Sequence, residues 1–456
     1  MPIGASVTIQ QPTRALGWHT GTVTSTAFLT DRYELTMVEG ALLSGTADRR
    51  CMFEVFARSL PSGRRYGVVA GTGRLLELIA DFRFTEAELD WLRMENVVNT
   101  ATLDWLADYR FRGDVWGYRE GEVYLPGSPI LIVEGGFAEA VLLETLALSV
   151  LNYDSAVAGA AARMVSVAGG RPLAEMGSRR ASERSAVAAA RSAYIAGFGA
   201  TSNLEAGRSW GIPTMGTSAH AFTLLHDSEE AAFRAQVAAL GAGTTLLVDT
   251  YDVPTAVELA VAVAGTGLGA VRIDSGDLPV QVAAVRRQLD SLGAVHTKIT
   301  VTNDLDEYGI AALAGSPVDS YGVGTSVATG SGSPTAGMVY KLVAHLDDTG
   351  EWVAVAKKSA AKASVGGRKS AGRRLTDLGV ATTEVIHIGA GPEGAAAPDE
   401  RNLIVPLIVD GVAVAGFTGP DGVAAAREHR AAAVAELPIE ALRLGRGEPV
   451  IPTVYA

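Results

Sequence analysis

From about residue 170 onward the sequence repeats one pattern, in which a short apolar run ends in Gly, Ser, Thr, Asn or Asp and a longer run with helical spacing follows. The pattern predicts strands near 172–176, 196–200, 212–216, 245–249, 269–273, 298–302 and 318–323. It predicts helices near 183–194, 203–210, 228–240, 254–264, 278–291 and 305–313. Successive strand–helix–strand crossovers imply a parallel sheet, and their regular spacing favours a closed α/β barrel over an open doubly wound sheet.

The segments on either side of these repeats have a different pattern. Helical stretches alternate with strand-like pieces over 23–135, which predicts an N-terminal α+β domain. We expect the α/β barrel to span 136–350 and a C-terminal segment over 351–456 to pack on the N-terminal domain and complete it. Residues 1–22 are expected to be a flexible lead-in.

The composition excludes several classes of protein. Hydrophobic residues make up 48 % and charged residues 19 %, as in a well-buried globular protein. The net charge of −12 argues against nucleic-acid binding, which requires clustered Lys and Arg. The single cysteine, Cys51, excludes an internal disulfide and a cysteine-clustered zinc site. No secretory signal is seen, and the nearest approach to a membrane-spanning run is at 256–271, so we expect a cytoplasmic protein without a membrane segment.

One stretch departs from this acidic character. Residues 357–374 carry seven basic side chains and no acidic one. Two interpretations stay open: a solvated loop, or a flap that attracts an anionic substrate. Both place the basic side chains at the surface.

Polar residues cluster at the C-terminal end of each expected barrel strand, which is where the active sites of α/β barrels lie. The clusters are EMGSRRAS (175–182), GATSN (199–203), GTSAH (216–220), DTYD (249–252), RIDSGD (272–277), TNDLDE (302–307) and YGVGTS (321–326). Any one cluster could consist of turn residues and helix caps. All of them together, in register, indicate an active-site rim.

The types of residue on this rim indicate an anionic, phosphate-bearing substrate. The run GVGTSVATG follows the last strand, where barrels commonly bind phosphate through backbone N–H groups, although a mobile loop has the same composition. Arg272 could contact the substrate or form a buried ion pair with a rim carboxylate. Arg179 and Arg180 would face opposite ways in an extended segment, so only one is expected to enter the pocket, where a guanidinium suits a carboxylate-bearing substrate.

Acidic residues on the rim have three candidate roles. Asp249, Asp252, Asp274 and Asp277 could hold Mg²⁺ directly or through water, bind ribose hydroxyl groups, or cap helices. Helix capping is expected for at least one of them.

His220 is the most informative single residue of the rim. It ends the GTSAH cluster, and the acidic DTYD cluster follows on the next strand. A neighbouring carboxylate fixes the tautomer of an imidazole and raises its basicity, and the neutral nitrogen is then a competent nucleophile toward a phosphoryl group. Although a lone histidine is more often structural, this context predicts that His220 lies in the active site.

Taken together, the motifs resemble those of the nicotinate phosphoribosyltransferase family. The resemblance runs from TDRYELTM (30–37) to about residue 410 and includes EMGSRRAS, GATSNLEAG, GTSAHAF, LLVDTYDV, RIDSGDL, VTNDLDE, YGVGT and, more loosely, KKSAAKAS. It implies a funnel-like, incomplete α/β barrel and a homodimer with shared active sites. It also implies Mg²⁺ and an ATP-coupled reaction of nicotinate with 5-phosphoribosyl 1-pyrophosphate, giving nicotinate mononucleotide and pyrophosphate in NAD salvage.

The same resemblance implies roles for individual residues. His220 would be phosphorylated by ATP, with Asp249 as the carboxylate beside it. Tyr33 would stack on the pyridine ring in the neighbouring subunit's site, and Arg179 would lie near that ring. The other substrate-binding positions would be Ser202, Arg272, Asp274, Ser275, Gly276, Asn303, Asp304, Gly322, Gly324 and Thr325.

Two departures from the family pattern and three rival functions stay open. Met176 stands where nicotinamide-using relatives have a ring-stacking Phe. Gly366 and Gly367 stand where the basic loop often has Pro-Gly, which leaves the roles of three lysines undecided: Lys358, Lys362 and Lys369. The rivals are a nicotinamide enzyme, a quinolinate enzyme, and a non-catalytic relative that binds phosphoribosyl ligands.

Overall fold

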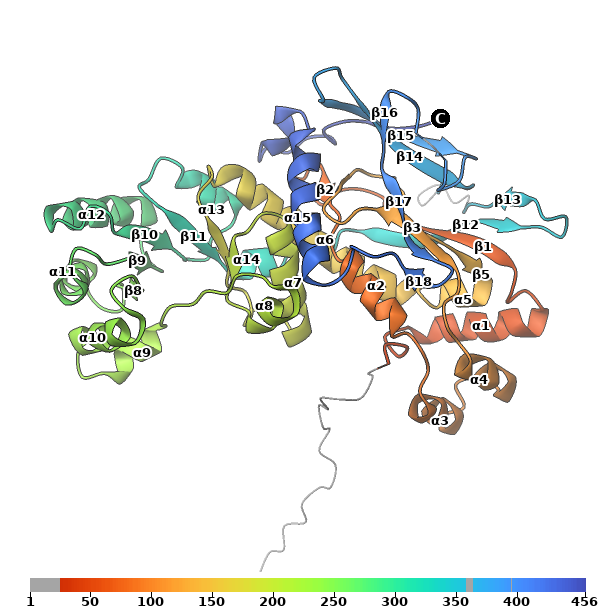
Figure 1. Cartoon of the computed structure of the whole chain (residues 1–456), viewed down its shortest axis with the longest axis horizontal. Coiled ribbons are helices and arrows are strands. Elements are labelled where there is room, and N and C mark those ends of the chain that lie inside the picture. Colours follow the sequence, from red (N-terminus) through yellow and green to blue (C-terminus); the bar gives the residue numbers. More distant parts are fainter. Residues whose placement is uncertain (1–24, 358–363, 395) are drawn as a thin grey trace, which may run out of the picture.

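The structure is a computed structural model that describes residues 25–357, 364–394 and 396–456. The expected lead-in over 1–22, together with Lys358 and Lys362, lies outside the described residues. The molecule is elongated, with a parallel sheet at one end and an antiparallel sheet toward the other (Figure 1). The two sheets have separate hydrophobic cores, so the fold is a mixed α/β structure of two main parts.

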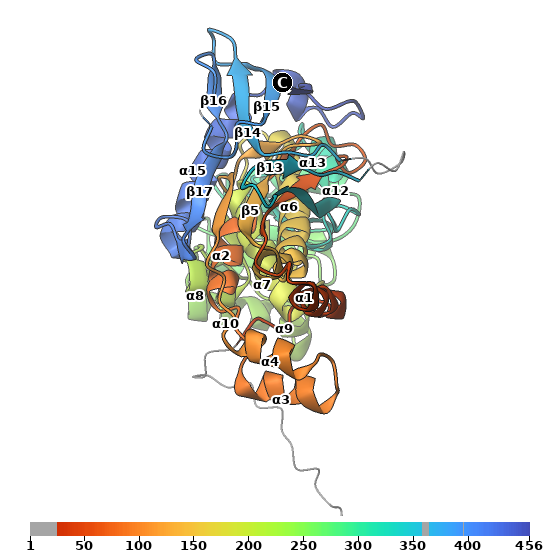
Figure 2. The same ribbon diagram turned by 90° about the vertical axis from the view of Figure 1, so that its right-hand side faces the viewer.

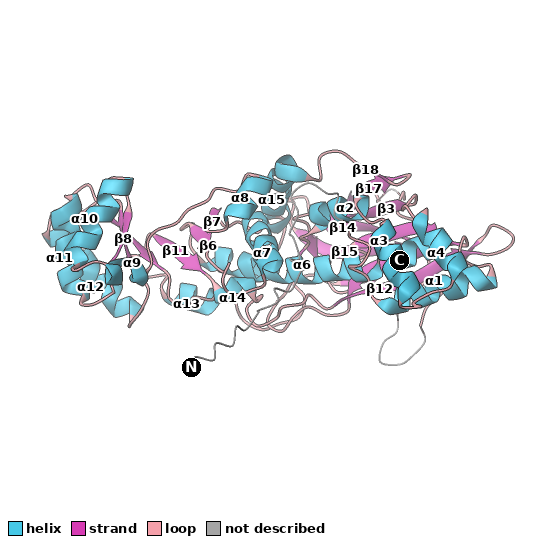
Figure 3. Ribbon diagram, turned by 90° about the horizontal axis from the view of Figure 1, so that it is seen from below, coloured by secondary structure: helices cyan, strands magenta, loops and turns pink. Residues whose placement is uncertain are grey.

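The parallel sheet has six strands in the order β7-β6-β11-β10-β9-β8. They are β6 (Leu173–Glu175), β7 (Ala200–Thr201), β8 (Thr245–Leu247), β9 (Ala270–Ile273), β10 (Lys298–Val301) and β11 (Ser320–Val323). The main connecting helices are α7 (Glu183–Ile195), α8 (Leu204–Trp210), α10 (Glu229–Leu240), α11 (Val253–Ala264), α12 (Leu278–Ser291) and α13 (Glu307–Ala312). Helices α10, α11 and α12 cover the outer end of this sheet (Figure 3). The periodicity of the sequence therefore located all six expected helices to within a few residues.

Two expected features are not formed: the strand near 212–216 and the closure of the parallel sheet into a barrel. This segment makes only an isolated bridge, between Thr214 and Thr201. Pro213 has no N–H group to donate to a neighbouring strand, which limits the pairing of the segment. The parallel sheet therefore stays open, a curled half-barrel with β7 and β8 at its edges.

One helix connects the two cores. The chain from Phe137 to Val167 forms α5 (Phe137–Val141) and α6 (Glu144–Val167). The first half of α6 packs in the core of the antiparallel sheet, and its second half packs in the core of the parallel sheet. By length and composition this stretch could cross a membrane, so it, rather than 256–271, is the most membrane-like segment among the described residues. It is a core helix, because 67 % of its apolar window is buried inside the protein.

The antiparallel sheet takes strands from both ends of the chain, in the order β13-β12-β1-β5-β3-β17-β18. The strands are β1 (Arg50–Ala57), β3 (Asp114–Tyr118), β5 (Leu131–Gly136), β12 (Met338–Leu346), β13 (Trp352–Ala354), β17 (Ile404–Val409) and β18 (Val412–Ala413). A separate pair consists of β2 (Gly67–Val68) and β4 (Val123–Tyr124). Because β17 pairs with β3, the C-terminal segment contributes strands to the N-terminal sheet.

The remaining helices surround the antiparallel sheet or close the chain. They are α1 (Arg32–Ser44), α2 (Thr72–Ala80), α3 (Glu86–Met94), α4 (Thr100–Ala107), α15 (Gly419–Ala435) and a 3₁₀ turn (Ile439–Leu442). Figure 2 shows α3 and α4 at the opposite end of the view from a four-stranded sheet. That sheet has the order β16-β14-β15-β19, with β14 (Lys369–Leu375), β15 (Ala381–Ile388), β16 (Glu400–Asn402) and β19 (Thr453–Tyr455).

Two basic side chains of the stretch 357–374, Lys369 and Arg373, belong neither to a solvated loop nor to a flap, because both lie in β14 and are buried. Lys369 is buried and its Nζ lies 2.6 Å from Glu54 Oε2. Arg373 is fully buried between Glu122 and Glu384, at 2.7 and 2.8 Å. Neither interpretation holds for these two side chains, because β14 turns them into the interior, where Glu54, Glu122 and the strand partner Glu384 neutralise them.

Candidate active site

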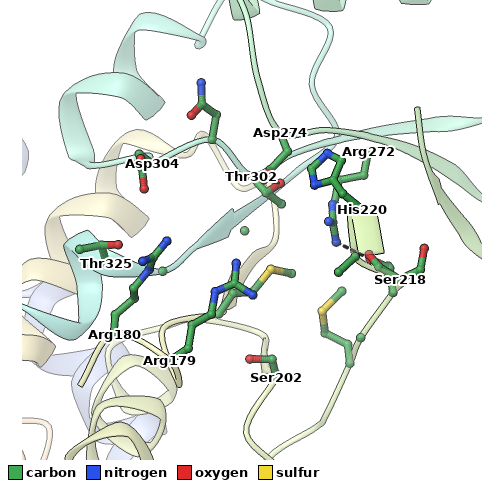
Figure 4. A pocket seen from close by; sticks show the side chains of 18 residues that line it. Arg179, Arg180, Ser202, Ser218, His220, Arg272, Asp274, Thr302, Asp304 and Thr325 are labelled. Atoms are coloured by element: carbon green, nitrogen blue, oxygen red, sulfur yellow. Dashed lines mark hydrogen bonds between the residues drawn. The ribbon is translucent and has the colours of Figure 1, made fainter. Parts of the chain in front are cut away.

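A cavity of about 440 Å³ opens at the carboxyl ends of the parallel strands (Figure 4). The expected site residues that line it are Arg179, Ser202, His220, Arg272, Asp274, Asn303, Asp304, Gly322, Gly324 and Thr325. Arg180, the alternative to Arg179 in the sequence analysis, also lines it. The sequence did not single out several other lining residues: Met215, Gly216, Thr217, Ser218, Ala219 and Thr302. Most of these missed residues stand inside the same polar clusters, so the clusters themselves were the available signal.

His220 is the first residue of α9 (His220–Leu225) and stands at the cavity wall. Its Nε2 lies 3.1 Å from Asp249 Oδ1, and its side chain is 39 % exposed while that of Asp249 is 1 % exposed. Within the described part of the chain, Nδ1 has no hydrogen-bond partner. The pair therefore holds one ring nitrogen and leaves the other available to a ligand.

The other oxygen of Asp249 is held by the segment that follows β9. Oδ2 accepts hydrogen bonds from the backbone N–H of Asp274, at 2.9 Å, and from Ser275 Oγ, at 2.6 Å. The structure therefore places Ser275 against Asp249, outside the residues that line the cavity. Three hydrogen bonds fix the orientation of this buried carboxylate, and through it the orientation of the imidazole.

The rim carboxylates divide into caps and cavity residues. Asp252 caps α11 by accepting from the N–H of Thr255, and Asp277 caps α12 by accepting from the N–H of Val280. Asp274 instead faces the cavity, where its Oδ1 accepts a hydrogen bond from Thr302. Two of the four candidate carboxylates are therefore helix caps, which leaves Asp274 as the one that lines the cavity.

Arg272 presents a guanidinium group to the cavity without forming the buried ion pair that was an open alternative. Its Nη1 donates to Thr217 Oγ1, and no ion pair involves it among the described residues. Burial lowers its pKa from the usual arginine value. Its Nε is also buried without a hydrogen-bond partner in this part of the chain. A partly buried cation of this kind is suited to bind an anion that enters the cavity.

Arg179 and Arg180 both line the cavity, contrary to the expectation that only one would enter. The expectation assumed an extended segment. The backbone instead forms a turn, closed by a 2.8 Å hydrogen bond from the N–H of Arg180 to the carbonyl of Gly177. The turn removes the strict alternation of an extended segment, and the two guanidinium groups point into the cavity together (Figure 4).

Two glycines bring the backbone close to the far wall of the cavity. A Cβ atom at Gly322 would lie 2.7 Å from Met176 Sδ, and one at Gly324 would lie 3.2 Å from the Met176 carbonyl oxygen. Asp304 also lines the cavity and has a φ of 24°, an uncommon value for a residue with a side chain. The chain is thus bent closely around this part of the cavity.

Tyr33 is the one expected site residue that lies far from the cavity. It belongs to α1, at the end of the molecule opposite the parallel sheet (Figure 1). Its side chain is 45 % exposed. Partial burial and the nearby charge of Glu144 raise its pKa to about 12. The single chain does not bring Tyr33 to its own cavity.

Comparisons with known proteins agree with one another. The family model of the nicotinate phosphoribosyltransferase (NAPRTase) N-terminal domain matches residues 28–152. The chain is 58 % identical over 433 residues to nicotinate phosphoribosyltransferase pncB1 of Mycobacterium tuberculosis, covering 93 % of this chain and 94 % of that protein. It is 36 % identical over 351 residues to nicotinate phosphoribosyltransferase of Bacillus subtilis, covering 75 % and 71 %.

A solved structure with the same overall fold is that of human nicotinic acid phosphoribosyltransferase. It is similar with a TM-score of 0.78 and 26 % sequence identity, covering 94 % of this chain and 97 % of the human chain. The similarity therefore extends over both main parts of the fold. The chain belongs to the nicotinate phosphoribosyltransferase family.

Proposed function

We propose that this protein joins nicotinate to 5-phosphoribosyl 1-pyrophosphate, giving nicotinate mononucleotide and pyrophosphate for NAD salvage, and that it couples the transfer to ATP hydrolysis through phosphorylation of His220. One observation carries the proposal. A single cavity is lined by His220, which pairs with the buried Asp249, and by Arg179, Arg180 and Arg272. None of these three arginines forms an ion pair within the described ranges. Three unpaired guanidinium groups beside a histidine suit substrates that carry carboxylate and phosphate groups.

The transfer itself requires positioning and charge more than acid–base catalysis. The lone pair of the pyridine nitrogen forms a bond to the anomeric carbon as the bond from that carbon to pyrophosphate breaks. Pyrophosphate leaves with the bonding electrons, so the ring nitrogen needs no general base. Guanidinium groups in the cavity stabilise the departing anion, and the fixed walls hold the ring in line with the anomeric carbon.

His220 has the geometry of a phosphoryl acceptor. Asp249 Oδ1 accepts a hydrogen bond from Nε2–H and so favours the tautomer with a bare Nδ1, whose lone pair can attack the terminal phosphorus of ATP. The bond from that phosphorus to the bridging oxygen breaks, and ADP leaves with the electron pair. The phosphorylated ring is cationic, and the buried carboxylate of Asp249 stabilises it.

Mg²⁺ fits the carboxylates of the cavity when substrate phosphates complete its ligands. Asp274 and Asp304 both line the cavity. Within the described part of the chain, no three His, Cys, Asp or Glu side chains are grouped to hold a metal by themselves. Mg²⁺ in phosphate-handling enzymes typically takes one or two carboxylates plus substrate oxygens, so Asp274 and Asp304 would hold it. When bound, the ion neutralises charge on the pyrophosphate.

The 5′-phosphate of the ribose is assigned to the wall formed by Gly322, Gly324 and Thr325. Both glycines line the cavity and carry no side chain, so their main chain faces the cavity directly. Arg180 points toward Thr325 across the cavity and supplies positive charge there (Figure 4).

We assign the carboxylate of nicotinate to Arg179 and its ring to a neighbouring subunit's Tyr33 in a homodimer. The half-exposed Tyr33 on the opposite end of the molecule supports this arrangement, because a second copy can present it to the cavity. The open edges of the half-barrel leave the cavity accessible to such a copy.

Turnover of nicotinate, nicotinamide and quinolinate with 5-phosphoribosyl 1-pyrophosphate tests the proposed function. We expect nicotinate to be the preferred substrate. Arg179→Gln should lower kcat/KM for nicotinate about 10- to 100-fold, because a charge-assisted hydrogen bond to the carboxylate is lost, and should change kcat/KM for nicotinamide little. Arg208→Gln, on the exposed surface of α8, is the control and should behave as wild type. Activity with nicotinamide alone, or with no pyridine at all, would overturn the proposal.

A further inference from the structure

A buried carboxylate lies directly behind the two arginines of the cavity. Glu175 is the last residue of β6 and has no exposed surface. No cation pairs with it among the described residues. One carboxylate oxygen, Oε1, accepts from the backbone N–H of Gly177, and the other, Oε2, accepts from Thr201 Oγ1 at 2.6 Å. Burying a carboxylate without a counter-charge costs free energy, and burial raises its pKa. The burial of Glu175 at this free-energy cost indicates that its carboxylate has a function in the site.

The first hydrogen bond holds the turn that carries the arginines. Gly177 begins this turn, and its carbonyl accepts from the N–H of Arg180. The fit around Gly177 is tight: a Cβ atom there would lie 2.8 Å from Glu175 Oε1 and 2.8 Å from the carbonyl oxygen of Gly324. The carboxylate therefore fixes Gly177 against the wall that carries Gly324.

The second hydrogen bond holds the neighbouring strand. Thr201 is the last residue of β7, and the next residue, Ser202, lines the cavity. The backbone N–H of Ser202 also donates to the carbonyl of Glu175, at 2.8 Å. One residue thus connects two strand ends and sets the spacing between the arginine turn and Ser202.

We propose that Glu175 is a positioning residue that directs both Arg179 and Arg180 into the cavity, and that it thereby determines the preference for a pyridine that carries a carboxylate. This inference rests on the proposed function. Glu175 does not line the cavity itself, so it acts through the turn and not by touching the substrate. Without the bond to Gly177, the turn is free to relax and the guanidinium groups move away from their shared direction.

Two substitutions of Glu175 separate its hydrogen bonds to the turn from its negative charge. Glu175→Met removes both acceptors at similar size and leaves the N–H of Gly177 without a partner. Glu175→Gln keeps an acceptor for Gly177, and its NH₂ group can donate to the Thr201 hydroxyl, which accepts as well as donates. The readout is the ratio of kcat/KM for nicotinate to kcat/KM for nicotinamide, measured with labelled substrates, together with the KM for 5-phosphoribosyl 1-pyrophosphate.

We expect Glu175→Met to lower the nicotinate preference by about tenfold or more, in line with the loss of one charge-assisted hydrogen bond, and to raise the KM for 5-phosphoribosyl 1-pyrophosphate. Glu175→Gln should stay within about threefold of wild type on both measures. Glu307→Gln is the control for a buried carboxylate elsewhere: Glu307 pairs with Arg163, and its loss should lower stability without changing the ratio.

The outcomes keep the inference separate from the proposed function. A wild-type protein that does not use nicotinate contradicts the proposed function. An active wild type whose ratio is unchanged in folded Glu175→Met contradicts the inference, as does a Glu175→Gln variant that loses the preference fully. Should Glu175→Met fail to fold, Thr201→Val removes one of the two bonds; a ratio equal to that of wild type in this variant also overturns the inference.

Discussion

Ser275 Oγ lies 2.6 Å from Asp249 Oδ2, on the side of the carboxylate opposite the oxygen that meets His220. The hydroxyl group and the backbone N–H of Asp274 together hold the carboxylate from behind. This arrangement resembles the outer support of a metal-ligating histidine, in which a carboxylate is itself fixed by further hydrogen bonds. The orientation of His220 thus depends on the loop after β9 as well as on Asp249.

Two substitutions that weaken this support should slow phosphorylation of His220 to different extents. Asp249→Asn replaces an acceptor by a group that cannot stabilise a cationic ring, and we expect the phosphorylation rate to fall about 10- to 100-fold. Ser275→Ala removes one of three hydrogen bonds and should cost only a few-fold. Rapid-quench measurement of label transfer from γ-labelled ATP gives both rates. Equal effects of the two substitutions would contradict the proposed order of importance.

His220→Ala should abolish the covalent label. Incubation of the wild-type protein with γ-labelled ATP is expected to give an acid-labile, base-stable phosphoryl group, as a phosphorus–nitrogen bond requires. His226→Ala is the matched control at the C-terminal cap of the same helix, since its ring nitrogen Nδ1 lies 2.8 Å from the Phe222 carbonyl oxygen and it does not line the cavity. It should keep the label. Label retained on His220→Ala would remove His220 from its assigned role.

Arg373 and Arg374 should differ strongly in their effect on stability, although they are adjacent in the basic stretch. Arg373→Met leaves Glu384 buried without a cation, whereas Glu122 keeps Arg401 and His429, and we expect the free energy of unfolding to fall by about 3–5 kcal/mol. Arg374 is 45 % exposed, so Arg374→Met should cost less than about 1 kcal/mol.

Urea denaturation measures both losses of stability. The KM for 5-phosphoribosyl 1-pyrophosphate should stay unchanged in the folded fraction of each variant. A normal stability with a raised KM in Arg373→Met would instead support a direct role of this residue at the substrate.

Glu34 should make stability depend on pH. Its Oε1 accepts from the N–H and the hydroxyl of Thr145 at the start of α6, and its Oε2 is buried without a partner in the described part of the chain. Burial raises the pKa of this carboxyl from 4.5 to about 7. Because the folded state binds the proton more tightly, this contribution to stability is fully present below pH 4.5 and is lost as the pH rises through about 7.

Glu34→Gln removes this dependence, since the amide stays neutral and still accepts from Thr145. We expect the variant to gain on the order of 1–2 kcal/mol over wild type at about pH 8 and little at about pH 4. Glu86→Gln, at an exposed position of α3, is the control and should show no such difference. An equal gain at both pH values would contradict this assignment.

The sequence was sufficient for the features that depend on local periodicity. The helices of the βα units and the polar clusters at the strand ends follow from residues close together in the chain, and the structure confirmed them. Ten of the expected site residues line one cavity for the same reason, because parallel strands bring their carboxyl ends to one edge. The pairing of His220 with Asp249 was expected from the order of the GTSAH and DTYD clusters along the chain, although no strand forms before GTSAH.

The features that the sequence did not give depend on contacts between distant segments. Burial of Arg373 requires Glu384, its partner on the neighbouring strand β15, and Glu122, which lies just before β4 and is far away in the sequence. The shared direction of Arg179 and Arg180 requires a turn that Glu175 holds from behind. Whether the sheet closes depends on backbone hydrogen bonds to Pro213 and its neighbours, which no local pattern reports. The sequence thus determined the elements and the chemistry at their ends, whereas only the tertiary structure decided which charges are buried and which face the cavity, because burial and side-chain direction are set by the packing of the whole chain.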